Sequence, residues 1–357
     1  MEQEKNQLTP PRQAVVLGKR IAKPTGRFLA FLICGSILIA AFAMSSLWMG
    51  GEGESLFGRL SAFFQGGEKG VQTPNGEEGK PTEPPTADRE NGDSELPEGA
   101  IPIRGMDLSA ADRGVDYFQN ETAYLPNVSE LRARPWETVT PDMQKPLVLI
   151  LHTHATEAYL SEAATYLPSP VGDAIYSEDA ARGVIAVGDT LTETLNRSGI
   201  PTLHCRDLHG EAGTLRNSYA CSAECVETYL ARYPSIQYVI DLHRDSILTG
   251  DGAYVRTETT VNGTRIAQVM AVVGTDGNGT EHSAWEQNLS LALQLRDGLN
   301  AQGSLCRPVS LRNASYNQEL APHALLLEIG SGANTVEEAK RAAVLVGEAL
   351  ARIIKGE

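Results

Sequence analysis

Strand-like and helix-like hydrophobic patterns alternate along the chain after Pro146. Four short apolar runs have the composition of strands that are buried on both faces, and they lie at 147–151, 238–242, 266–274 and 324–328. Stretches with helical periodicity lie at 180–196, 286–299 and 336–354. Because strands and helices alternate, the pattern predicts an α/β fold with a mostly parallel sheet flanked by helices.

A longer apolar segment near the N-terminus has a different character. Residues 28–49 carry no charge, and the segment is long enough for a bilayer-spanning helix. Basic residues are frequent in 1–27, so the positive-inside rule predicts a cytoplasmic tail there, a single-pass transmembrane helix over 28–49, and an extracytoplasmic remainder. A cleaved signal peptide is the alternative, with Ala41-Phe-Ala43 as its cleavage site.

Composition divides the rest of the chain into three parts. Residues 50–100 are rich in Gly, Glu, Pro and Asp and have few aliphatic side chains, which predicts a disordered tether. Residues 101–144 hold scattered apolar positions and form an N-terminal subregion. The clear alternation of strands and helices then predicts the main domain at 145–357.

Charge and cysteine content limit the classes of function. The formal net charge of −15 argues against binding to nucleic acid or to an anionic lipid surface, because both need clustered basic residues. The five cysteines form no CxxC pair and therefore make a poor structural zinc motif. Cys221 and Cys225 would lie one helical turn apart, so an extracytoplasmic disulfide and buried free thiols are both open.

Polar side chains gather at the ends of three predicted strands. The first end carries His152, His154 and Glu157, the second carries Asp241, His243 and Asp245, and the last carries Glu328. In open α/β sheets the carboxyl ends of the strands form the binding edge. Imidazoles and carboxylates are the ligands of catalytic zinc, which leaves one position for water. The pattern therefore predicts a zinc hydrolase in which a further Glu acts as acid and base.

Other chemistries have weaker signals. Taken alone, any one of these His or Glu residues could be a structural residue at a strand end. His204 and His209 follow a predicted strand at 200–203 and are further candidate ligands. Cys205 adjoins His204, so a cysteine nucleophile is an alternative. A serine nucleophile is not supported, because the chain has no G-x-S-x-G elbow and Ser331 has no evident His partner.

Seven motifs in order along residues 145–357 resemble stage II sporulation protein P. They are LHTHATEAY at 151–159, VGDTL at 187–191, IDLHRD at 240–245, MAVVGT at 270–275, WEQNL at 285–289, RNASYNQ at 312–318 and LLEIGS at 326–331. The resemblance implies a domain similar to zinc-dependent N-acetylmuramoyl-L-alanine amidases. Such enzymes cleave the amide between N-acetylmuramic acid and the L-alanine of the stem peptide, and some family members are credited with cutting peptide crosslinks.

The resemblance also implies a setting. The family acts on peptidoglycan during engulfment in sporulation, in the space between the mother-cell and forespore membranes. Its partners are stage II sporulation proteins D and M.

The amidase pattern uses two His and one Glu on zinc and a catalytic Glu at a later strand end. Carried over, His243 is the second His ligand and Glu328 is the catalytic acid and base. The first His is His152 or His154, which would share a face in an extended chain. His154 is preferred because it precedes Glu157 by three residues, a spacing that brings the two side chains together in a turn.

The remaining roles are open. Glu157 is the preferred carboxylate ligand, while the position of the ligand in general amidases points to Glu178. Asp241 and Asp245 are expected to orient the ligand imidazoles. Arg244 either binds a substrate carboxylate or pairs with Asp245. At the level of the whole protein, the alternative function is an inactive peptidoglycan-binding scaffold at the membrane.

Overall fold

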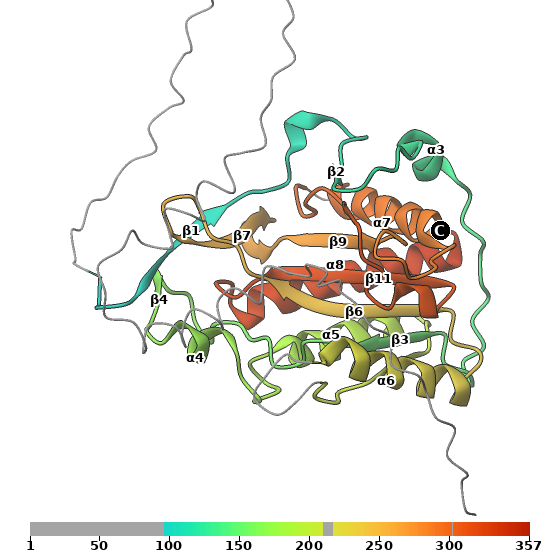
Figure 1. Cartoon of the computed structure of the whole chain (residues 1–357), viewed down its shortest axis with the longest axis horizontal. Helices are drawn as coiled ribbons and strands as arrows, with labels where there is room; N and C mark the ends of the chain where they lie inside the picture. Colours follow the sequence, from blue (N-terminus) through green and yellow to red (C-terminus); the bar gives the residue numbers. More distant parts are fainter. Residues whose placement is uncertain (1–95, 210–216, 302) are drawn as a thin grey trace, which may run out of the picture. The chain divides into compact units, whose positions relative to one another are not determined.

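The computed structural model describes residues 96–209, 217–301 and 303–357 (Figure 1). The largest sheet of this part of the chain has seven strands. Their order is β2 (Gln119–Asn120), β10 (Ser310–Arg312), β9 (Val269–Gly274), β11 (His323–Ser331), β6 (Tyr238–Asp245), β3 (Val148–Leu151) and β5 (Thr202–His204). Neighbouring strands are parallel except β9 and β11, which are antiparallel. The predicted α/β architecture is confirmed, with a mixed sheet in place of a uniformly parallel one. Figure 1 shows β9, β11, β6 and β3 side by side.

A second, smaller sheet was not expected from the sequence. It has the order β4 (Tyr166–Leu167), β1 (Ile101–Met106), β7 (Tyr254–Val261) and β8 (Thr264–Ala267). The single strand predicted for 266–274 is wrong, since Gln268 separates β8 from β9. The buried Gln268 amide donates to Asp107 and to the Ser304 carbonyl, so its side chain anchors the point where the chain passes between sheets.

Helices cover the two faces of the large sheet unequally. The helices α5 (Val184–Arg197), α7 (Trp285–Asn300) and α8 (Val336–Lys355) pack on one face, where α3 (Val128–Ala133) adds to α7. The helix α6 (Ser218–Arg232) packs on the other face. The short helix α4 (Val171–Ile175) and the 3-10 turns η1 (Ala111–Arg113) and η2 (Gln318–Leu320) complete the described elements. The three predicted helices are therefore confirmed, with ends shifted by a few residues.

Strand periodicity decides which side chains meet each helical layer. In β6, Tyr238, Ile240 and Leu242 face the layer of α5, α7 and α8, whereas Val239 faces α6. Successive side chains of a strand alternate between faces. Asp241 and His243 therefore lie on the α6 face of the sheet.

The described residues include no helix with the length and hydrophobicity needed to cross a bilayer. The tail expected at 1–27, the span expected at 28–49 and residues 50–95 of the expected tether lie outside the described ranges.

Close packing of α5 against α8 gives a first prediction. A Cβ on Gly347 of α8 would lie 2.8 Å from Thr194 Cγ2 and 2.9 Å from Thr194 Cβ in α5. Gly347→Ala should lower the free energy of unfolding by about 1–3 kcal/mol, because overpacking outweighs the gain in helix propensity. Urea denaturation measures this change.

Gly298 of α7 provides the matched control. A Cβ there would meet only the Cβ of Ala349, at an ordinary 3.8 Å. Gly298→Ala should leave stability unchanged or raise it by about 0.5–1 kcal/mol. Equal effects of the two substitutions would contradict the packing argument.

Candidate active site

A tight turn after β3 brings His154 and Glu157 together. The strand ends at Leu151, and the Glu157 amide donates to the His154 carbonyl at 3.0 Å. His154 Nδ1 then lies 3.6 Å from Glu157 Oε1. The three-residue spacing predicted this approach correctly.

His243 of β6 completes the group. Its Nδ1 lies 3.5 Å from Glu157 Oε2, and its ring meets the His154 ring edge to face at 4.9 Å. All three side chains are buried, and one ligand atom from each lies within 4.8 Å of the others. Two imidazoles and one carboxylate are a donor set that suits zinc and leaves a position open.

Asp241 contacts the ring nitrogen of His243 that faces away from Glu157. Asp241 Oδ1 lies 2.9 Å from His243 Nε2, although the angle is not that of a hydrogen bond. The Asp241 carboxylate also accepts hydrogen bonds from the Thr153 amide at 2.8 Å and the Thr153 hydroxyl at 2.7 Å. The carboxylate therefore ties β6 to the turn that carries His154, as expected of a group that orients a ligand imidazole.

The electrostatics of this buried group favour a cation. Burial by itself would raise the pKa of Glu157, but Arg244 and the two imidazoles hold it well below its usual range. Burial would lower the pKa of His243, but Asp241 and Glu157 raise it well above its usual range. Positive charge is thus strongly favoured between Glu157 and Asp241.

Glu328 lies beside His243 on the neighbouring strand. The parallel register of β11 and β6 pairs these two residues directly, so their side chains share the α6 face. Glu328 Oε2 is buried and has no hydrogen-bond partner among the described residues. Burial and then the nearby Asp245 raise the pKa of Glu328 to about 8, although His243 opposes them. Such a carboxyl is suited to exchange protons near neutral pH.

Arg244 points away from this group, because it follows His243 along the strand. Its side chain is 1% exposed and donates to the carbonyls of Ile175 at 2.7 Å and Ala158 at 3.3 Å. Its backbone amide donates to Glu157 Oε2 at 3.1 Å. A guanidinium buried in this way cannot bind a substrate carboxylate, so that expectation is wrong, and Arg244 instead braces the Glu157 segment.

The expected pairing of Arg244 with Asp245 is also only partial. Arg244 reaches the Asp245 carbonyl at 3.4 Å, whereas the Asp245 carboxylate accepts a 2.7 Å hydrogen bond from Arg307. Arg307 was not singled out in the sequence, and no local motif marks it. It lies 62 residues from Asp245 along the chain.

His152 is not part of the group, and the expectation that it shares a face with His154 is wrong. Its Nδ1 contacts the Leu242 carbonyl at 2.8 Å, and its Nε2 lies 2.8 Å from His204 Nε2. Burial and then His204 lower the pKa of His152 to about 3. The turn after His152 ends the extended conformation, so His154 lies on the opposite face of the sheet from His152. The other candidate carboxylate, Glu178, is exposed and does not join the group.

A second cluster lies behind the turn. Cys205, His209 and Cys225 offer donor atoms within 4.8 Å of one another, and the two Sγ atoms are 2.9 Å apart. Cys205 faces Cys225, whereas His204 contacts His152 and Asp189, so the adjacent Cys205 and His204 form no dyad.

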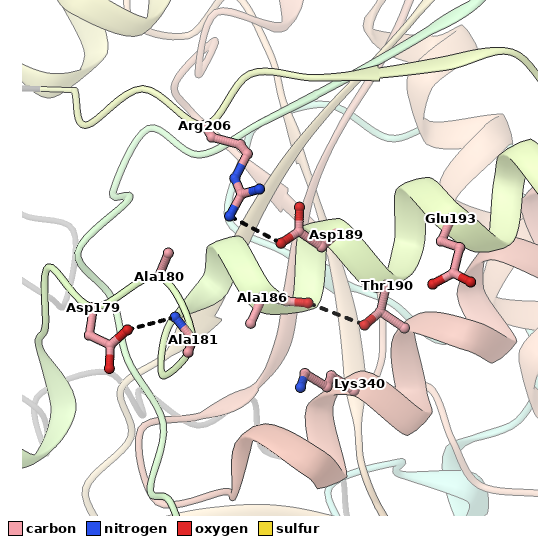
Figure 2. A pocket seen from close by; sticks show the side chains of 9 residues that line it. All are labelled: Asp179, Ala180, Ala181, Ala186, Asp189, Thr190, Glu193, Arg206 and Lys340. Carbon is pink, nitrogen blue, oxygen red and sulfur yellow. Dashed lines mark hydrogen bonds and ion pairs between the residues drawn. The ribbon is translucent and has the colours of Figure 1, made fainter.

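A surface pocket of about 550 Å³ lies elsewhere, along α5 (Figure 2). Its charged lining includes Asp189 and Arg206, paired at 3.3 Å, together with Lys340 of α8. None of His154, Glu157, His243 and Glu328 lines it.

Comparisons with known proteins give a consistent result. The family model described as stage II sporulation protein P matches residues 67–355. Stage II sporulation protein P of Bacillus subtilis (strain 168) is 32% identical over 211 residues, which are 56% of this chain and 49% of that protein. The match thus spans about half the length of that curated relative.

Two solved structures align with more than half of this chain. The N-acetylmuramyl-L-alanine amidase Ami1 of Mycobacterium smegmatis is 16% identical, with 59% of this chain and 96% of that chain covered and a TM-score of 0.33. The CwlD amidase from Clostridioides difficile, in complex with the GerS lipoprotein, is 15% identical, with 59% and 95% covered and a TM-score of 0.32.

The bracing role of Arg244 can be tested by Arg244→Lys. An ammonium group cannot reproduce the fork that meets the Ile175 and Ala158 carbonyls, so at least one buried hydrogen bond is lost. Stability should fall by about 1–3 kcal/mol in urea denaturation. Arg206→Lys, at an exposed ion pair with Asp189, is the control and should change stability by less than about 1 kcal/mol. A stable Arg244→Lys protein with weakened substrate binding would restore the substrate-binding interpretation.

Proposed function

Because the chain belongs to the stage II sporulation protein P family, we propose that it is a zinc-dependent peptidoglycan hydrolase. The bond cut is the amide between N-acetylmuramic acid and the L-alanine of the stem peptide. The observation that carries the proposal is the buried group of His154, Glu157 and His243, with Glu328 in register beside His243.

The three side chains would hold zinc through two imidazoles and a carboxylate. Zinc, when bound, supplies a Lewis acid that polarises the amide carbonyl and makes water a better nucleophile. Asp241 holds the His243 ring, and Arg244 holds the Glu157 carboxylate through its backbone amide. The site is thereby fixed before substrate arrives, which avoids reorganisation during the reaction.

Glu328 is the acid and base of the proposed reaction. Its buried Oε2 makes no hydrogen bond with any described residue and is available to accept a proton from the attacking water. The same carboxyl then donates that proton to the leaving amine of L-alanine. The adjacent carboxylate of Asp245 accepts a 2.7 Å hydrogen bond from Arg307, which fixes its position.

The setting of the reaction is part of the proposal. The uncharged run at 28–49 supports a membrane anchor that leaves the catalytic domain between the mother-cell and forespore membranes. Family membership supports a role in engulfment, with stage II sporulation proteins D and M as partners. Cleavage of peptide crosslinks is a second activity to be scored in the same assay.

Glutamate substitutions separate metal binding from proton transfer. In the full chain, Glu328→Gln should retain metal and slow the release of stem peptides by about 10²–10⁴-fold, because only the proton carrier is lost. Glu157→Gln should lower the metal content by about one ion per chain, because a ligand is lost. Metal analysis and mass spectrometry of peptides released from purified peptidoglycan provide the two measurements.

Glu178→Gln is the matched control and should change neither quantity, since Glu178 is exposed and outside the group. New N-terminal L-alanine in the products identifies amidase cleavage, whereas newly exposed crosslink termini identify endopeptidase cleavage. Protein that binds peptidoglycan without metal and releases no peptide would support the scaffold function instead.

A further inference from the structure

We propose that Cys205, His209 and Cys225 form a second metal site, which binds a thiophilic divalent cation such as zinc. The site shares no ligand with His154, Glu157 and His243.

The three donors come from separate parts of the fold. Cys205 follows the end of β5 and is buried, and Cys225 lies on α6. Their Sγ atoms are 2.9 Å apart, and an imidazole nitrogen of His209 lies within 4.8 Å of both. Thiolate and imidazole are the ligands that zinc prefers, and two Cys with one His leave a fourth position for water.

The orientation of His209 is the observation that favours a metal. Its Nδ1 contacts the His152 carbonyl at 2.8 Å, so a neutral ring donates its proton there and carries the free lone pair on Nε2. Nε2 is buried and makes no hydrogen bond of acceptable geometry with the described residues. Metal-binding imidazoles are held in this way, with one nitrogen donating to a carbonyl and the other on the metal.

One thiol of the pair, that of Cys205, loses its proton readily, whereas the contact with Cys205 and burial raise the pKa of Cys225. The hydrogen bond with Cys225 lowers the pKa of Cys205 to about 5, although burial opposes this shift. A thiolate is the form that binds metal.

A disulfide between Cys205 and Cys225 is the competing state. Zinc–sulfur bonds of about 2.3 Å in a tetrahedron place two sulfurs roughly 3.8 Å apart, whereas a disulfide needs about 2.05 Å. The observed 2.9 Å separation is between these values, so distance alone does not decide. A disulfide would leave His209 Nε2 without a partner, whereas a metal would satisfy it.

A metal here would support the neighbouring site. It would join the segment after β5 to α6, and through His209 it would hold the carbonyl of His152, two residues before His154. The second metal would therefore position the turn that carries His154 and would not touch the substrate.

Cobalt distinguishes the two sites, because only thiolate ligands give an intense near-ultraviolet charge-transfer band. The full chain, reduced and then loaded with Co²⁺ without oxygen, should show this band. His243→Ala should bind about one fewer ion per chain and keep the band. Cys205→Ser and Cys225→Ser should each lose it. Cys221→Ser is the matched control, one turn before Cys225 and outside the cluster, and should keep it.

His209→Ala keeps the test decisive if the cysteine variants do not fold. It should weaken cobalt binding at the thiolate site by more than the roughly 10–100-fold that loss of an outer-shell partner costs. Absence of the band from folded, reduced wild-type protein would overturn the proposal. The proposal would also be overturned if peptide mapping without reductant found a Cys205–Cys225 disulfide and the reduced thiols then bound no metal. Loss of metal in His243→Ala alone would bear on the first site only.

Discussion

The buried carboxylate of Glu157 is the constraint around which this end of the sheet is organised. It is 2% exposed, and a carboxylate removed from water is costly unless charges and hydrogen-bond donors surround it. His154 and His243 lie on one side, and the Arg244 amide donates from the strand itself. The turn after β3 and the end of β6 are therefore held together by the same group that is proposed to bind the metal.

The second constraint is the two-fold periodicity of the central strands. Along β6, Tyr238, Ile240 and Leu242 enter the core under α5, α7 and α8, whereas Val239 faces α6. Asp241, His243 and Asp245 follow one another on that second face, and the register of β11 adds Glu328 beside His243. An acid–base group and its metal ligand are thus fixed on two adjacent strands, which position side chains more firmly than loops do.

The two clusters are linked through the turn at His152 to His154. Thr153 bonds Asp241 and also the Ser222 hydroxyl of α6, while the His152 carbonyl meets His209. His152 itself faces α5, where Gly188 leaves room for it: a Cβ at Gly188 would lie 2.6 Å from His152 Nε2. His152 thus faces α5, whereas Thr153 and His154 contact α6 and β6 on the other face of the sheet, so this short segment carries both a ligand and its supports.

Local sequence determined the parts of the structure that depend on short-range chemistry. Apolar runs placed β3, β6 and β11, the strand ends marked His243 and Glu328, and a three-residue spacing paired His154 with Glu157. Tertiary structure alone decided the rest. It separated His152 from His154, buried Arg244, brought Arg307 to Asp245, and set Cys205 against Cys225 in place of Cys221. It also divided 266–274 between two sheets at Gln268. Hydrophobic periodicity indicates only whether a side chain faces an apolar layer. The contacts decided by the tertiary structure join residues that are distant in the chain, and they depend on how turns and strands pack together.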